Sequence, residues 1–187
     1  MKTMTQEQGA VTVKPYVSLA LKVSIAAIFA ALVAVATLTF VIPIPATNGY
    51  FNLGETLIYV AALLFGPLVG AIAGAGASIA DMLVAPQFAP GTFTIKIIEG
   101  FLVGYLTKKL NRKIKSLTLC ATIAIMIGGF EMVLGYFLYE TIALGYPATL
   151  ALLEVPFNIV QMLAGLIIAV PIMHAIQRIF PQLKSYL

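Results

Sequence analysis

The sequence contains no tryptophan, one cysteine and one histidine, and only 10% of its 187 residues are charged. A lone cysteine cannot form a disulfide within the chain. Cys120 lies in a hydrophobic segment, where we expect it to be a small core residue, and His174 is expected near a membrane interface. The Cys and His spacings of a zinc site are absent, so no metal is expected.

Motifs that carry catalysis or bind nucleotides are also absent. The chain has no HExxH, no G-x-S-x-G and no nucleotide-binding loop. Paired carboxylates could move protons, but no nucleophile accompanies them. We therefore expect a protein that is not an enzyme, that holds no cofactor, and that cannot couple ATP to transport by itself.

Hydrophobic residues make up 61% of the chain, and the mean hydropathy is +1.03, far above the values of soluble domains. Six apolar stretches are separated by short polar or turn-rich segments. The sequence predicts an all-α fold, a bundle of six transmembrane helices in a single domain of residues 1–187, with residues 1–15 as a polar leader. The stretches cover residues 17–42, 53–65, 67–85, 93–107, 117–139 and 149–176.

The lysines and arginines report the orientation of this bundle. With six crossings, ten of the eleven fall on one side, which the positive-inside rule makes cytoplasmic. Five crossings would separate the C-terminal cations from the N-terminal ones. We expect both termini on the cytoplasmic side of the cell membrane. Because topology explains these cations, the net charge of +4 does not indicate nucleic acid. The ten are Lys2, Lys14, Lys22, Lys108, Lys109, Arg112, Lys113, Lys115, Arg178 and Lys184.

The acidic residues lie toward the opposite, outer side, together with the remaining cation, Lys96. A charge at the centre of a bilayer costs about 2.5–3.5 kcal/mol on insertion scales, so such residues usually mark a functional interior. Six of the seven carboxylates belong to this outer set: Glu55, Asp81, Glu99, Glu131, Glu140 and Glu154.

Several polar side chains share one depth below the outer surface, roughly 5–18 Å at about 1.5 Å per residue. This overlap predicts one polar pocket between the fourth, fifth and sixth helices, capped by the first outer loop. Internal polar ties, such as a Lys96–Glu99 pair, are the alternative; the excess of carboxylates favours a pocket. The expected lining is Tyr50, Phe51, Asn52, Lys96, Glu99, Glu131, Tyr136, Tyr139, Glu154, Asn158 and Gln161.

The segments around this pocket carry further signals. Tyr50 and Phe51 form either a lid or part of an interfacial aromatic belt. The segment at residues 53–65 reaches only about 20 Å, short of a roughly 30 Å hydrocarbon core, and so leaves a concavity on the outer side. Pro156 is expected to bend the last helix.

Small residues predict close helix packing in two places. Gly66, Gly70, Gly74 and Ser78 form a stripe on the third segment that favours packing inside the chain. The first segment repeats alanine four residues apart, and this face could pack internally or against another protein. The alanines are Ala26, Ala27, Ala30 and Ala31.

The runs at residues 49–55 (GYFNLGE), 61–70 (AALLFGPLVG) and 74–81 make the chain resemble a substrate-binding S component of an energy-coupling factor (ECF) vitamin transporter, most closely the riboflavin type. The resemblance implies capture of a vitamin from outside. It implies as partners a transmembrane coupling subunit and two cytoplasmic ATPase subunits. In the family, an Ala-x-x-x-Ala face on the first helix contacts the coupling subunit, which matches Ala26/Ala30 and Ala27/Ala31. Family sites use the first outer loop and helices four to six.

The side chains of the expected pocket limit which vitamin could bind. Its carboxylates disfavour anionic folate, biotin or pantothenate. Absence of tryptophan weakens the case for a thiamine-type ring, although Tyr136, Tyr139 and Phe157 could stack on such a ring in place of tryptophan. Riboflavin fits first, then pyridoxine- or hydroxymethylpyrimidine-type compounds. Two other functions stay open: an autonomous carrier with a proton-linked carboxylate such as Glu131, and, more remotely, a membrane enzyme.

Overall fold

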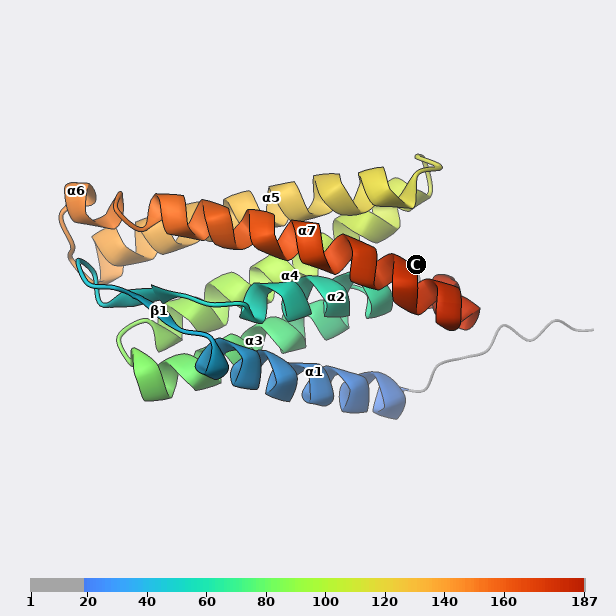
Figure 1. The fold of residues 1–187 in the computed structure, drawn as a ribbon, viewed down its shortest axis with the longest axis horizontal. Coiled ribbons are helices and arrows are strands. Elements are labelled where there is room, and N and C mark those ends of the chain that lie inside the picture. Colours follow the sequence, from blue (N-terminus) through green and yellow to red (C-terminus); the bar gives the residue numbers. More distant parts are fainter. Residues whose placement is uncertain (1–18, 187) are drawn as a thin grey trace, which may run out of the picture.

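A computed structural model describes residues 19–186, which form a bundle of helices running back and forth along one axis (Figure 1). Six helices carry the bundle, and each corresponds to one apolar stretch of the sequence. They are α1 (Leu19–Thr39), α2 (Gly54–Phe65), α3 (Pro67–Val84), α4 (Ala89–Asn111), α5 (Leu117–Leu138) and α7 (Val155–Ile179). The predicted helical bundle is confirmed in outline.

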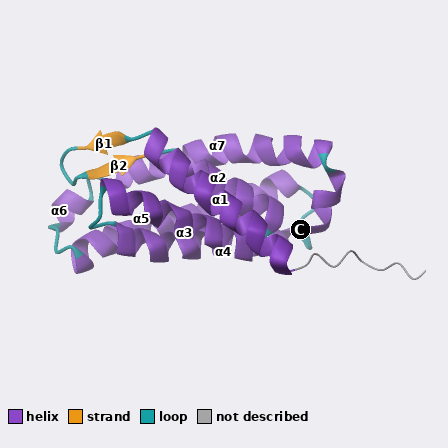
Figure 2. Cartoon of the chain, turned by 90° about the horizontal axis from the view of Figure 1, so that it is seen from below, coloured by secondary structure: helices purple, strands orange, loops and turns teal. Residues whose placement is uncertain are grey.

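Shorter elements lie at the ends of these helices. A π-helical turn, η1 (Tyr139–Ala143), extends α5, a single turn, α6 (Ala148–Ala151), precedes α7, and a 3-10 segment, η2 (Pro181–Tyr186), follows it. Two strands, β1 (Ile42–Ile44) and β2 (Gly49–Phe51), pair antiparallel with Ile42 opposite Phe51. These strands are a departure from the all-α prediction (Figure 2).

The two ends of the bundle differ. The β1–β2 hairpin, the α3–α4 connection and α6 lie at one end, called here the hairpin end (Figure 1). The start of α1, the α4–α5 connection and the C-terminus lie at the other, called the termini end. The cation-rich segment of residues 108–115 is therefore at the same end as the C-terminus. The predicted leader at residues 1–15 lies outside the described residues.

Helix α2 is the central helix of the bundle. It packs against α1, α3, α4 and α7, and Ile58, Tyr59 and Leu63 are fully buried. Its twelve residues span about 18 Å, in agreement with the short second segment expected from the sequence. Gly66, with φ of 86°, makes the reversal into α3, and Pro67 then occupies the first turn, where no amide partner is needed.

Helices α3 and α4 pack at glycines. A Cβ on Gly104 would lie 2.6 Å from the backbone of Gly66 and Pro67, and Cβ atoms on Gly70 and Gly74 would meet backbone atoms of α4. Side chains at these positions would push the helices apart. The small-residue stripe thus packs inside the chain, as the sequence predicts.

The last apolar stretch differs from its prediction. Residues 149–176 are not one helix: α6 ends at Ala151, and α7 begins at Val155. Pro156 lies in the first turn of α7 and bends nothing, because an amide there has no intrahelical partner to lose. The proline inside α7 is Pro171.

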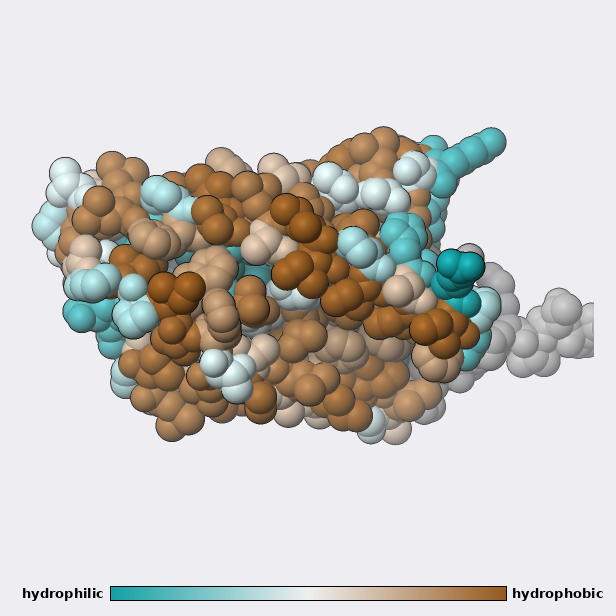
Figure 3. Space-filling view, viewed as in Figure 1, coloured by the Kyte–Doolittle hydropathy of each residue, from teal (hydrophilic) through white to brown (hydrophobic). Residues whose placement is uncertain are grey.

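The outside of the bundle is apolar. Large hydrophobic side chains such as Phe130 on α5 and Ile167 on α7 are exposed, and Figure 3 shows a hydrophobic surface over most of the face between the two ends. Within residues 19–186, four helical stretches are long and apolar enough to cross a membrane: Leu19–Thr39, Pro67–Val84, Leu117–Ala143 and Ala148–Ile179. The chain is thus a multi-pass membrane protein, whose polar interior requires a separate explanation.

Candidate functional site

A buried ionic network occupies the middle of the bundle. The Lys96 ammonium on α4 donates hydrogen bonds to Glu55 of α2 and, over 3.1 Å, to Oε2 of Glu99. The Tyr59 hydroxyl donates to Oε1 of Glu99 over 2.8 Å. Lys96 is 3% exposed and Glu55 2%. A charge so deep in a helix bundle is tolerated only when it is paired and hydrogen-bonded.

Gln161 of α7 joins this network to the β1–β2 hairpin. Its Nε2 donates to Oε2 of Glu55 over 3.1 Å, and its Oε1 accepts from the backbone amide of Asn52 over 3.1 Å. The Asn52 side chain turns toward α2 and accepts a hydrogen bond from the amide of Gly54. Gln161 therefore fixes the exit of β2 relative to Lys96 and Glu55.

Two tyrosines of the expected lining hold α5 against α4. The Tyr136 ring lies 5.5 Å from the Lys96 nitrogen, and its hydroxyl is 2.9 Å from the Thr92 hydroxyl. Tyr139 donates to the carbonyl of Gln87 over 2.8 Å and packs on Gly91, where a Cβ would lie 2.6 Å from its ring. Tyr136 thus faces the network, and Tyr139 holds the α3–α4 connection.

Tyr50 connects the hairpin to the end of α3 that lies at the hairpin end of the bundle. Its hydroxyl donates to Asp81, and both burial and the Asp81 carboxylate raise the pKa of Tyr50. Phe51 beside it is partly buried. The first outer loop is therefore an ordered structure held at both ends, by Tyr50 on α3 and by Asn52 on α7.

Glu131, Glu154 and Asn158 have spare hydrogen-bonding capacity. Oε2 of Glu131 and Oε1 of Glu154 are buried and bonded to nothing in the described part of the chain. Asn158 is 9% exposed, and its side chain has no hydrogen bond within residues 19–186. Glu131 lies within electrostatic reach of Lys96 and Glu55. These three residues differ from Lys96, Glu99 and Gln161, whose polar groups have partners.

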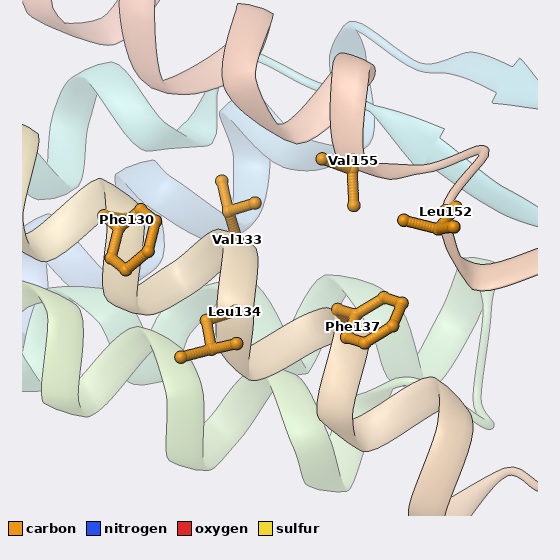
Figure 4. A pocket seen from close by; sticks show the side chains of 6 residues that line it. All are labelled: Phe130, Val133, Leu134, Phe137, Leu152 and Val155. Atoms are coloured by element: carbon orange, nitrogen blue, oxygen red, sulfur yellow. The ribbon is translucent and has the colours of Figure 1, made fainter. Parts of the chain in front are cut away.

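A cavity of about 130 Å³ lies between α5 and the α6–α7 break, and only apolar side chains line it (Figure 4). It is not the polar pocket expected from the sequence, although Glu131 and Glu154 are the sequence neighbours of two of its residues. Within residues 19–186, no group of three or more His, Cys, Asp or Glu side chains could hold a metal ion. The lining residues are Phe130, Val133, Leu134, Phe137, Leu152 and Val155.

The structure thus brings Lys96, Glu99, Gln161 and Tyr136 together and adds Glu55, which the expected lining omitted. Sequence reasoning missed Glu55 and Tyr59 because only the depths of the last three long helices were compared. The signal was present: Glu55 belongs to the outer carboxylates and ends the GYFNLGE run.

The alanine face of α1 is divided in two. Ala26 is fully buried, and Ala30 abuts α3, since a Cβ on Gly76 would lie 2.8 Å from the Ala30 Cα. Ala27 and Ala31 are exposed. One alanine pair therefore packs internally, and the other is free to contact a partner.

Residues 19–178 match the family model described as ECF-type riboflavin transporter, S component. The matched region includes α1 to α5 in full, α7 except for its last residue, and every residue of the network. A similar protein from Pyrococcus woesei, an uncharacterised protein in the gap 3′ region, is 39% identical over 137 residues, which cover 73% of this chain and 88% of that protein.

Proposed function

Because the chain belongs to the family of ECF-type riboflavin transporter S components, a family of substrate-binding transporter subunits and not of enzymes, we propose that it captures riboflavin outside the cell for ATP-driven uptake. The observation that carries the proposal is the match over residues 19–178, combined with a polar interior inside an apolar bundle.

The orientation follows from the two ends of the bundle. All six long helices cross the membrane, with the hairpin end outside and both termini in the cytoplasm. The cations of residues 108–115 at the termini end support this, because positively charged loops stay inside. Helix α2, at twelve residues, is much shorter than the hydrocarbon core and is shielded from lipid by α1, α3, α4 and α7.

The binding site lies beneath the β1–β2 hairpin, between α4, α5 and α7. Glu131 supplies a hydrogen bond to the ligand, because its Oε2 is buried without a partner in the described chain, and the buried Asn158 amide supplies another. Tyr136 and the hairpin residues Tyr50 and Phe51 supply aromatic contact. The Lys96–Glu55–Glu99 network forms the floor, and Gln161 couples this floor to the hairpin.

The chemistry of this site favours a neutral aromatic vitamin. A flavin ring stacks on tyrosine or phenylalanine, while its polar edge and hydroxylated chain bond carboxylate and amide groups. An anionic vitamin would meet Glu131 and Glu154, and Lys96, the cation in this part of the described chain, is already paired with Glu55 and Glu99. Riboflavin is the first choice, and pyridoxine- or hydroxymethylpyrimidine-type compounds are the alternatives.

The partners are a transmembrane coupling subunit and two cytoplasmic ATPase subunits. The chain carries no nucleotide-binding loop, so ATP must be hydrolysed elsewhere. The exposed pair Ala27 and Ala31 on α1 is the contact with the coupling subunit, since small residues let another membrane helix approach closely.

A second function has one observation in its favour. The unpartnered carboxylate of Glu131 inside a membrane protein suits a carrier driven by a proton gradient. Vitamin uptake into vesicles by the purified chain alone, dependent on a pH gradient, would support that carrier. Uptake that requires the coupling and ATPase subunits supports the S component.

The identity of the vitamin is tested by mass spectrometry of small molecules that co-purify with the chain. Riboflavin at near-equal molar amount is expected. A pyridoxine- or hydroxymethylpyrimidine-type compound would change the substrate but leave the assignment to a vitamin-capturing subunit intact.

A further inference from the structure

Two acidic side chains at the hairpin end take no part in the Lys96 network. Glu140 lies in η1 and Glu154 at the start of α7, and their carboxyl groups lie next to each other. Glu140 is 0% exposed and Glu154 is 5% exposed. Both oxygens of Glu140 and Oε1 of Glu154 are buried without a hydrogen bond to any described residue.

No cation in the surrounding segments balances this pair. Residues 42–51, 82–95 and 141–153, which form the hairpin end, contain no lysine, arginine or histidine. Lys96 is engaged by Glu55 and Glu99. The titratable groups of the neighbouring elements are tyrosines that bond elsewhere: Tyr50 to Asp81, Tyr139 to the Gln87 carbonyl and Tyr146 to the Thr47 carbonyl.

Two adjacent buried carboxyl groups cannot both be ionised without a large electrostatic cost, so such a pair holds a proton between them. The shared proton supplies the donor that the two groups otherwise lack. It also leaves one negative charge where two would repel each other.

The pair is connected to the turn of the hairpin by two contacts. The Glu154 carboxyl lies directly against Gly49, where a Cβ would come within 2.7 Å of its Cδ. The backbone carbonyl of Glu140 accepts from the amide of Tyr146 over 2.9 Å, and the Tyr146 hydroxyl donates to the Thr47 carbonyl over 3.2 Å. Displacement of the Glu154 carboxyl group therefore reaches Gly49 directly, and the backbone of Glu140 is tied to Thr47 through Tyr146.

We propose that Glu140 and Glu154 form a proton-binding site whose occupancy fixes the β1–β2 hairpin on the outer end of the bundle. With the proton bound, Glu154 stays packed beneath Gly49 and the turn is held. With the proton lost, the two carboxylates repel each other, Glu154 leaves Gly49, and the turn is released. The proposal does not depend on riboflavin being the vitamin, because both carboxyl groups and the hairpin are contacts within this chain.

The test follows the mobility of the turn directly. A nitroxide is attached to cysteine at the exposed turn position Ala46 in the full chain, with Cys120→Ala to remove the native thiol, and the protein is reconstituted in lipid. Electron paramagnetic resonance spectra are recorded from pH 5 to pH 10. We expect slow nitroxide motion at low pH and a single transition to faster motion as the pH rises.

Glu140→Gln and Glu154→Gln should each abolish this transition and keep the slow spectrum at all pH values, because an amide supplies the donor that the proton supplied. The matched control is Glu131→Gln, which changes a carboxylate outside the pair and should keep the transition. Size-exclusion profiles like that of the parent protein verify that each variant folds.

Three results would overturn the proposal. One is a spectrum that does not change with pH in the parent protein, and another is a transition that persists in Glu140→Gln. The third is a switch caused at constant pH by adding calcium and reversed by a chelator, which would make the pair a divalent-cation site.

Discussion

Lys96 of α4 and Glu55 of α2 form an ion pair in the buried centre of the bundle, where a second carboxylate, Glu99, shares the same ammonium group. The pair joins two helices that lie 41 residues apart at this point in the sequence. One lysine thus compensates two carboxylates, and Gln161 and Tyr59 supply the remaining hydrogen bonds. This relationship defines the polar floor beneath the hairpin.

Lys96→Met should destabilise the chain strongly, because it leaves Glu55 and Glu99 buried without a cation. Breaking one partner of a buried pair costs about 3–5 kcal/mol. The measurement is thermal unfolding in detergent, followed by circular dichroism. Lys109→Met, on the exposed part of the same helix, is the control and should change the melting temperature little. Equal melting temperatures for the two variants would show that the network contributes no stability.

Gly104→Ala should separate α3 from α4 at the termini end. The added Cβ would lie 2.6 Å from backbone atoms that cannot move alone, and such overpacking costs about 1–3 kcal/mol. The matched control is Gly135→Ala on α5, where the nearest atom, 3.0 Å away, belongs to the Ile95 side chain. Unfolding curves of both variants give the comparison. A more stable Gly104→Ala protein would contradict the close approach of these helices.

Ala27→Leu and Ala31→Leu together should block assembly with a coupling subunit and leave riboflavin affinity nearly unchanged, because both alanines are exposed and their helix packs mainly against α2 and α3. Co-purification with tagged coupling subunit measures the first effect. Ala26→Leu is the contrasting variant: Ala26 is fully buried, so this change should lower stability instead. Retained assembly of the double variant would move the partner contact to another helix.

Cysteine at Ala46 should react with membrane-impermeant reagents only from outside the cell, and cysteine at Lys109 only from the cytoplasm. The reason is the asymmetry of the cations, which gather at the termini end. The experiment uses a Cys120→Ala background in intact cells and inverted vesicles. The reverse pattern of labelling would place the hairpin in the cytoplasm and refute capture from outside.

The sequence predicted the helices well, because the length of an apolar stretch can be read from consecutive residues without knowing the tertiary structure. Each of the six main helices matches one apolar stretch. Helix α2, the shortest of the six, was recognisable from its thirteen-residue apolar run. The β1–β2 hairpin was missed, because three-residue strands containing Pro43 and Ile44 have no periodicity strong enough to detect. The break before α7 was missed for a similar reason: residues 152–154 are as apolar as their neighbours, apart from Glu154.

The site was predicted only in part. Counting residues from a helix end gives the depth of a side chain but not the direction in which it points. Lys96, Glu99 and Gln161 were therefore grouped correctly by depth, whereas Glu55 was left out and Glu140 and Glu154 were not recognised as neighbours. The alanine face of α1 also shows that position in the sequence does not give the direction of a side chain. Ala26 and Ala27 are adjacent in sequence, yet Ala26 is buried and Ala27 is exposed.

The central claim, that riboflavin binds between α4, α5 and α7, is tested most directly by calorimetric titration of the purified chain with riboflavin. Asn158→Ala removes a buried polar group that no described residue uses, and loss of such a bond costs about 1–3 kcal/mol. The account predicts binding weakened roughly 5- to 150-fold. Gln177→Ala, at the other end of α7, should bind like the parent protein. Equal riboflavin affinity for Asn158→Ala and the parent chain would contradict the account.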